Sequence, residues 1–105
     1  MAWIIEYTKQ ANADLSDLDN SQKRQVLKAI VKVSNNPLPG TEGGYGKPLG
    51  SALTGFYKIK LKKPGIRVCY RIVQENEIMR VVIISIRADD QVYKLLRERI
   101  KKKQI

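Results

Sequence analysis

Lysine and arginine recur at even spacings in two neighbouring segments of the chain. In the first segment Lys58, Lys60 and Lys62 alternate with apolar residues, and in the second Arg67 and Arg71 stand four positions apart. Because side chains alternate across a β-strand, each set should lie on one face of its strand. Like charges that face one another destabilise a sheet, so five of them on one patch indicate a surface that binds an anion. The alternative is a basic sheet face that is open to water.

The turn between the two segments decides which cations would face one another. Pro64-Gly65 suits the centre of a turn. If Lys63 and Ile66 flank a two-residue turn, the sequence predicts three opposed pairs: Lys62 with Arg67, Lys60 with Cys69, and Lys58 with Arg71.

Two further residues could border the same face. Arg87 ends a third apolar segment, and Tyr93 lies about two turns into the helix expected after it. Taken singly, such an arginine is usually solvated and such a tyrosine usually packs with its hydroxyl outward. The interpretation therefore depends on the whole set.

This set of side chains suits RNA cleavage without a metal, in which the 2′-hydroxyl attacks the adjacent phosphate. The reaction needs a base, an acid for the leaving 5′-oxygen and positive charge around the phosphate. The chain has no histidine. A lysine crowded by other cations is the natural candidate base, because neighbouring positive charge lowers the pKa of its ammonium. Arginine would supply fixed charge, and tyrosine would stack on a base or orient the sugar.

Other reactive residues have simpler interpretations. Cys69 alternates onto the basic face, but a lone strand cysteine is usually a small core residue, and the single cysteine cannot form an internal disulfide. Asp89 and Asp90 are better explained as helix caps than as metal ligands. The missing histidines also remove the usual zinc ligand sets. We expect neither a metal nor a cofactor.

Size and charge restrict the function classes. A length of 105 residues predicts one domain spanning residues 1–105, and a formal net charge of +10 favours a polyanionic partner. The charge is regional, because residues 43–74 contain seven basic residues and no acidic one. A basic face that serves only solubility remains the alternative. The N-terminus does not resemble a signal peptide and no apolar run spans a membrane, so we expect a soluble cytoplasmic protein.

The elements that would position these residues can be predicted from periodicity and from turn residues. Helical spacing begins at Lys9 and again near Asp19–Ser21, where Asp19 and Gln22 have the spacing of a capping box. The second helix should bury Val26, Leu27, Ile30, Val31 and Val33 and end before the Asn35-Asn36-Pro37 sequence.

The remaining segments favour strands and one more helix. Strands are predicted at Trp3–Thr8, Phe56–Leu61, Ile66–Val73 and Ile78–Ile86, and residues 37–55 read as a long functional or mobile loop. Val92, Leu95, Leu96 and Ile100 repeat at helical spacing after Asp89. The order β-α-α-β-β-β-α predicts an α+β domain, with a small antiparallel sheet packed against an N-terminal helical hairpin and a C-terminal helix.

At these residues the chain resembles the RelE family of bacterial toxins, within the RelE/ParE superfamily, and the resemblance covers nearly the whole length. It is carried by the order and spacing of several short motifs: Trp3-Ile4-Ile5-Glu6-Tyr7, Ala11 to Leu18, Asn36-Pro37, Leu53-Thr54-Gly55, Tyr57-Lys58-Ile59-Lys60-Leu61, Gly65-Ile66-Arg67-Val68-Cys69-Tyr70 and Ile86-Arg87 to Val92-Tyr93. Residues 40–52 are longer and richer in glycine than the family needs.

The resemblance implies a ribosome-dependent endoribonuclease that cuts messenger RNA in the ribosomal A site and is blocked by a RelB-like antitoxin. It implies that Lys60 is the general base, that Arg87 assists the leaving oxygen, and that Tyr93 orients the nucleotide. Lys58 and Arg67 would stabilise the phosphate, while the extra cations Lys62, Lys63 and Arg71 would contact RNA. Two alternatives stay open: a ParE-like gyrase inhibitor, and a non-catalytic basic RNA-binding module.

Overall fold

The computed structural model describes residues 2–50, 53–62, 65–86 and 89–105. Within these residues the chain forms five strands and three α-helices, together with short 3-10 turns at Gly40–Glu42 and Gln74–Asn76. The elements follow the order β1 (Ile4–Tyr7), α1 (Lys9–Ser16), α2 (Asn20–Ser34), β2 (Lys47–Pro48), β3 (Phe56–Leu61), β4 (Ile66–Val73), β5 (Ile78–Ser85) and α3 (Asp89–Lys101).

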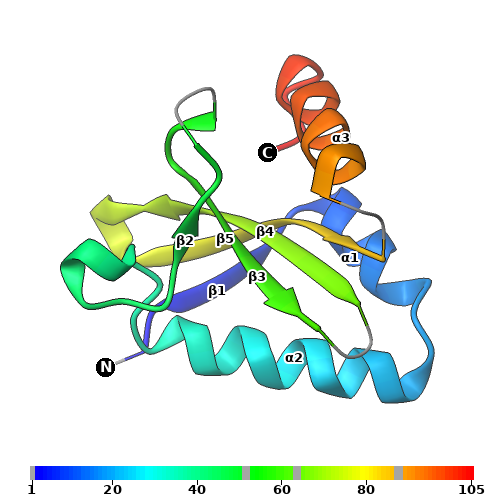
Figure 1. The fold of residues 1–105 in the computed structure, drawn as a ribbon, viewed down its shortest axis with the longest axis horizontal. Helices are drawn as coiled ribbons and strands as arrows, with labels where there is room; N and C mark the ends of the chain where they lie inside the picture. Colours follow the sequence, from blue (N-terminus) through cyan, green and yellow to red (C-terminus); the bar gives the residue numbers. More distant parts are fainter. Residues whose placement is uncertain (1, 51–52, 63–64, 87–88) are drawn as a thin grey trace.

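The strands form one twisted sheet in the order β1-β5-β4-β3-β2, with α2 beneath it and α3 above it in the view of Figure 1. The α+β class is confirmed, with two additions to the expected antiparallel sheet. The first strand, β1, runs parallel to β5, and the short strand β2 extends the opposite edge by pairing with β3. A two-residue strand that contains a proline leaves no period-two pattern, so it could not be recognised in the sequence.

Local side-chain contacts fix where the first two helices begin. The Ala11 N–H donates to the Thr8 hydroxyl at 3.1 Å, which caps α1. The expected capping box of α2 is present, because the Gln22 N–H donates to Asp19 Oδ1 at 2.8 Å and the Gln22 amide oxygen accepts from the Asp19 N–H. The α2 helix ends at Ser34, where the asparagines and Pro37 follow, as the sequence predicted.

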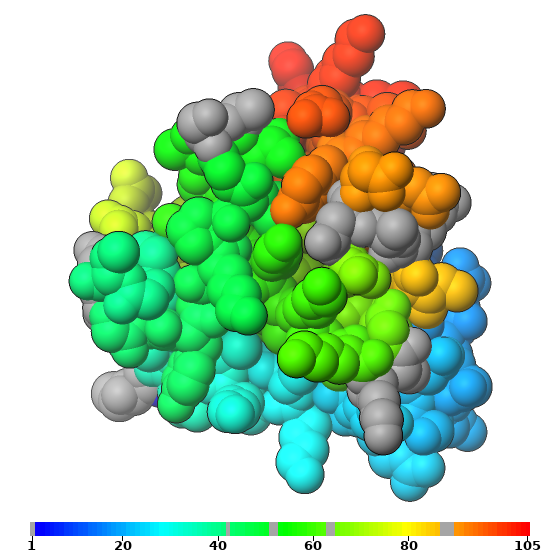
Figure 2. Space-filling view, viewed as in Figure 1, coloured from blue at the N-terminus to red at the C-terminus, as the bar shows by residue number. Residues whose placement is uncertain are grey.

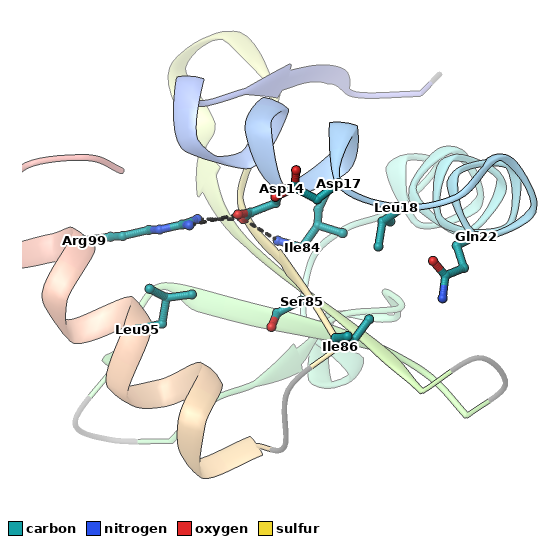
Figure 3. A pocket seen from close by; sticks show the side chains of 9 residues that line it. All are labelled: Asp14, Asp17, Leu18, Gln22, Ile84, Ser85, Ile86, Leu95 and Arg99. Atoms are coloured by element: carbon teal, nitrogen blue, oxygen red, sulfur yellow. Dashed lines mark hydrogen bonds and ion pairs between the residues drawn. The ribbon is translucent and has the colours of Figure 1, made fainter.

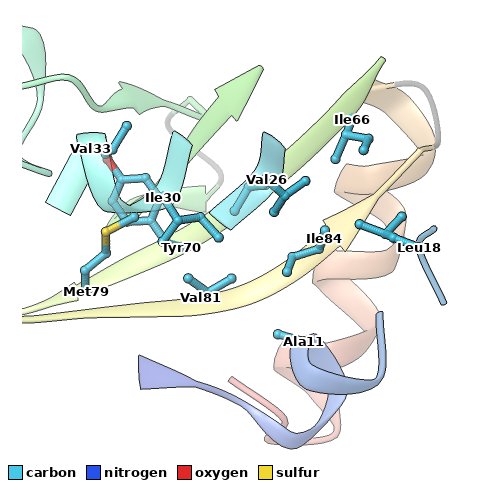
Figure 4. Close-up of a cluster of buried hydrophobic side chains, with 11 residues drawn as sticks. Ala11, Leu18, Val26, Ile30, Val33, Ile66, Tyr70, Met79, Val81 and Ile84 are labelled. Atoms are coloured by element: carbon cyan, nitrogen blue, oxygen red, sulfur yellow. The ribbon is translucent and has the colours of Figure 1, made fainter. Parts of the chain in front are cut away.

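One face of the sheet packs against α1 and α2 (Figure 4). From α2, Val26, Ile30 and Val33 enter this core. The prediction for Leu27 and Val31 was wrong, because these side chains are 37% and 57% exposed. They lie about 100° around the helix from the buried residues that precede them, which turns them from the sheet towards solvent.

Tyr70 of β4 is fully buried in this core, and its hydroxyl donates to the Pro37 carbonyl at 2.7 Å. Burial, with a smaller contribution from Tyr57, holds the pKa of the Tyr70 phenol above its ordinary value. The hydrogen bond ties the segment that follows α2 to the centre of the sheet.

The opposite face packs against α3. Its buried cluster contains Cys69 from β4 and Val92 and Leu96 from α3, together with Leu53, Phe56, Val82 and Ile83. Cys69 is fully buried, so its assignment as a core residue is confirmed. The alternation of β4 therefore places Arg67 and Arg71 on the same face as α3.

A buried ion pair ties α1 to α3 across the end of β5 (Figure 3). Arg99 of α3 donates to both carboxylate oxygens of Asp14 of α1, at 2.8 and 3.0 Å, and also to the Val82 carbonyl at 2.7 Å. The Ile84 N–H donates to the same carboxylate at 3.1 Å. Pairing between β1 and β5 runs only as far as Val81, so the two charged side chains satisfy backbone groups beyond the end of β1.

The segment 37–50 is held by backbone hydrogen bonds, which corrects its interpretation as a plain loop. The Gly44, Tyr45 and Gly46 N–H groups donate to the carbonyls of Pro39, Asn36 and Leu38, respectively, at 2.9 to 3.1 Å. A Cβ atom on Gly44 would lie 1.9 Å from the Leu38 carbonyl oxygen, so this close approach requires glycine.

Candidate active site

The two basic strands pair in a different register from the expected one. Lys60 pairs with Arg67 and Lys58 with Cys69, and the last pair is Leu61 with Ile66. The prediction was wrong because four residues separate the last pair, where a two-residue turn was expected. At the end of this turn, Gly65 adopts a left-handed φ of 81° and its N–H donates to the Leu61 carbonyl at 2.9 Å.

The register shift of two residues keeps Lys58, Lys60, Arg67 and Arg71 on their expected face but changes their neighbours. Lys60 is exposed and lies opposite the half-buried Arg67, whereas Arg71 lies opposite Phe56. Because a strand rises about 3.3 Å per residue, Arg71 stands about 13 Å along β4 from Arg67. The structure therefore brings Lys60 and Arg67 together and leaves Arg71 at the other end of the face.

Lys58 of β3 meets Tyr93 of α3. The Lys58 ammonium donates to the Tyr93 hydroxyl oxygen at 3.1 Å and lies 5.6 Å from the ring centroid. The distance from the ring centroid to the ammonium is nearly as long as the distance from the centroid to the hydroxyl oxygen plus the hydrogen bond. The ammonium therefore lies beyond the hydroxyl oxygen and not over the ring face. Both residues are half-buried, and the buried neighbour Val92 fixes how α3 presents Tyr93 to the sheet.

Three further residues were expected at the site. Lys62 is exposed in the turn after β3. Arg87 and Lys63 lie outside the described residues. The part of the set that the structure describes is thus a compact group, formed by Lys58, Lys60, Arg67 and Tyr93, and Lys62 stands beside it.

One neighbour of this group was not singled out from the sequence. Lys47 of β2 pairs with Lys58, so both side chains project from the same face of the sheet. Lys47 lies in the segment without acidic residues, and this position could have marked it as a candidate RNA contact. Its place beside Lys58 depends on strand β2, which the sequence did not predict.

A hollow of about 230 Å³ opens at this edge of the sheet, where β3 continues past the end of β2. Side chains from α2, the segment before β2, and β3 line it: Ala29, Lys32, Val33, Tyr45, Lys47, Lys58, Ile59, Lys60 and Leu61. Figure 2 looks onto this face, where the green side chains of β3 stand between α3 in orange and α2 in cyan. The lining combines apolar residues with four lysines.

A larger hollow, of about 370 Å³, lies around Asp14, Ile84 and Arg99 (Figure 3). Asp14 and Arg99 in its lining already bind one another, and none of the cationic group lines it, so the smaller hollow is the better candidate for the site. Among the described residues, no group of three or more His, Cys, Asp or Glu is placed to hold a metal ion. No described helix is both long and apolar enough to cross a membrane.

Comparison with known families now becomes informative. Residues 5–93 match the family model described as ParE toxin of type II toxin-antitoxin system, parDE. The chain belongs to this toxin family. The match covers most of the sequence and includes Lys58, Lys60, Arg67, Arg87 and Tyr93.

Curated relatives of this toxin carry RelE names. It is 28% identical to a putative RelE-like toxin protein of Escherichia coli, over 96% of this chain and all of that one. It is 26% identical to the mRNA interferase toxin RelE of E. coli K12, over 89% of this chain and 92% of that protein.

Solved structures agree with this relationship. A double arginine-to-alanine mutant of E. coli RelE in the free state superposes with a TM-score of 0.77 at 25% identity, covering 95% of this chain and 99% of that one. A RelBE toxin-antitoxin complex from Mycobacterium tuberculosis gives a TM-score of 0.69 at 25% identity, covering 83% and 100%. The resemblance to RelE toxins is confirmed, and with it the α+β fold.

Proposed function

We propose that this toxin is a metal-independent endoribonuclease that cuts messenger RNA in the ribosomal A site. The observation that carries the proposal is the meeting of Lys58 with Tyr93 on the sheet face that also holds the Lys60–Arg67 pair. A gyrase inhibitor would have no need for this arrangement of cations and a tyrosine hydroxyl. The name of the related E. coli protein, mRNA interferase toxin RelE, supports the same activity.

In the proposed reaction Lys60, as the free amine, takes the proton of the RNA 2′-hydroxyl. The 2′-oxygen then forms a bond to phosphorus, the bond from phosphorus to the 5′-oxygen breaks, and a 2′,3′-cyclic phosphate remains. Lys58 and Arg67 offset the charge that develops on the phosphate oxygens. Tyr93 orients the nucleotide, and Arg87 offsets the charge on the departing 5′-oxygen, which takes a proton from solvent and leaves as the 5′-hydroxyl. The place of Arg87 in the site rests on the sequence alone.

The proposed partners follow from charge and from the relatives. Seven basic residues in residues 43–74 suit messenger and ribosomal RNA in the cytoplasm. Related toxins form RelBE complexes with their antitoxins, so we propose that a RelB-like antitoxin holds this toxin inactive.

Cell-free translation tests the proposed function. We expect the purified chain to stop translation and to leave cut messenger only when ribosomes are present. Cutting of free messenger at the same rate would remove the ribosome from the proposal. Intact messenger, together with loss of gyrase supercoiling, would instead favour the ParE-like gyrase inhibitor that the sequence left as an alternative.

The Lys58–Tyr93 contact can be tested separately. Tyr93→Phe keeps the ring that packs against the cluster between α3 and the sheet but removes the oxygen that accepts from Lys58. Hydrogen bonds to charged groups contribute about 1.5–3 kcal/mol, so single-turnover cleavage on programmed ribosomes should slow by roughly ten- to a hundred-fold. Cleavage should be measured at a temperature at which circular dichroism shows the variant to be fully folded, so that the loss reports the hydroxyl and not stability. Wild-type cleavage by Tyr93→Phe would mean that the hydroxyl has no part in the reaction.

A further inference from the structure

An aromatic side chain stands exposed at the rim of the small hollow. Tyr45 is 53% exposed although its backbone is tightly held, because its N–H donates to the Asn36 carbonyl at 2.9 Å. The glycines on both sides, Gly44 and Gly46, pack so closely on the chain that neither could carry a Cβ without displacing backbone. The fold therefore holds the backbone at Tyr45 in place and leaves about half of this residue open to solvent.

One lysine contacts the ring, and others line the hollow beside it. The Lys32 ammonium lies 5.8 Å from the Tyr45 ring centroid, and Lys47 follows two residues later beside Lys58. Lys58 and Lys60 line the same hollow, so it is continuous with the cationic group. Proteins bind single-stranded RNA with such an arrangement of an exposed ring beside several lysines. A base stacks on the ring, and a phosphate contacts the lysines.

We propose that Tyr45, Lys32 and Lys47 form a nucleotide subsite that holds one base and one phosphate of single-stranded RNA next to the cleavage centre. This inference rests on the proposed function and extends it to the substrate strand. Tyr45 stacks on the base, Lys47 contacts the phosphate together with Lys58, and Lys32 supports the ring from α2. An acidic protein segment would satisfy the lysines but would leave the exposed aromatic face unused.

The subsite can be tested without ribosomes. A fluorescently labelled short single-stranded RNA of mixed sequence is titrated with the full chain at fixed salt, and binding is followed by anisotropy. Stacking on an aromatic side chain contributes roughly five- to a hundred-fold in affinity for each base, so Tyr45→Ala should weaken binding by that factor. Tyr45→Trp and Tyr45→Phe should bind within about two-fold of wild type because they keep a stacking face.

Two control variants separate stacking from other effects. Tyr45→Leu keeps an apolar side chain at an exposed position, so it should fold normally and still lose the affinity. Lys9→Ala removes one charge from the exposed start of α1, away from the hollow, and should bind RNA nearly as wild type does. Lys47→Ala should weaken binding more than Lys9→Ala and should reduce the salt dependence.

The subsite proposal and the proposed function fail in different ways. If Tyr45→Ala and Tyr45→Leu bind RNA as wild type does, the subsite proposal is wrong, whatever the enzyme cleaves. If they lose affinity for the antitoxin and not for RNA, the hollow is a protein-docking site and the proposal is equally overturned. If RNA binding depends on Tyr45 but wild-type toxin leaves ribosome-bound messenger intact, the subsite stands and the proposed function fails.

Discussion

Lys60→Ala should slow single-turnover cleavage of ribosome-bound messenger by roughly 10²- to 10⁴-fold, the range that a general base contributes. The side chain is exposed on β3 and lies opposite Arg67, so removing it takes away no packing. The free energy of unfolding should therefore stay within about 0.5 kcal/mol of wild type. Cleavage is measured with excess toxin over programmed ribosomes, so that the rate reports the chemical step and not binding.

The matched control again uses a lysine that is remote from the site. Lys9→Ala has the same change in net charge but should cleave at the wild-type rate. Lys62→Ala, at an exposed position beside the group, should raise the apparent KM and leave the single-turnover rate nearly unchanged. If Lys60→Ala cleaves as fast as Lys9→Ala, Lys60 is not the base. Loss of cleavage in Lys62→Ala and Lys60→Ala alike would assign the effect to charge in general.

The alternation of side chains along a strand predicted the sheet face on which these cations lie, but not which residues they face on the neighbouring strand. Alternation along a strand places Lys58, Lys60 and Arg67 on one face in any register that differs by an even number of residues. Which residues face one another depends on the length of the turn, and four residues lie between the last paired residues, two more than Pro64-Gly65 suggested. The face could therefore be predicted, whereas the Lys60–Arg67 pair required the structure.

Contacts between distant residues were harder to anticipate. Lys58 and Tyr93 are 35 residues apart, and Asp14 and Arg99 are 85 apart. Periodicity predicted that α3 buries Val92 and Leu96, but it carries no information on which strand the helix crosses. Family resemblance grouped Lys58 with Tyr93, although it gave no contact between them. The subsite around Tyr45 was missed because the tight backbone contacts of Gly44 and Gly46 arise only in the folded segment.

Arg99→Ala should lower the free energy of unfolding by about 3–5 kcal/mol, which is the usual cost of leaving one partner of a buried ion pair uncompensated. The Arg99 and Asp14 side chains are only 11% and 18% exposed, and their contact is bidentate. The substitution also removes the donor to the Val82 carbonyl. A folded domain is usually stable by only 5–15 kcal/mol, so the loss would be a large fraction of the total.

Urea unfolding at constant pH measures this effect, and the chain contains its own control. Arg80 and Glu6 form an ion pair with a similar contact of 2.7 Å, but their side chains are 28% and 45% exposed. Solvent screening limits such a pair to about 0–1 kcal/mol, so Arg80→Ala should cost far less than Arg99→Ala. Because Arg99 fastens the helix that carries Tyr93, its loss should also slow cleavage at temperatures where the variant is still folded. Equal costs for Arg99→Ala and Arg80→Ala would show that the Asp14–Arg99 pair does not hold α3 in place.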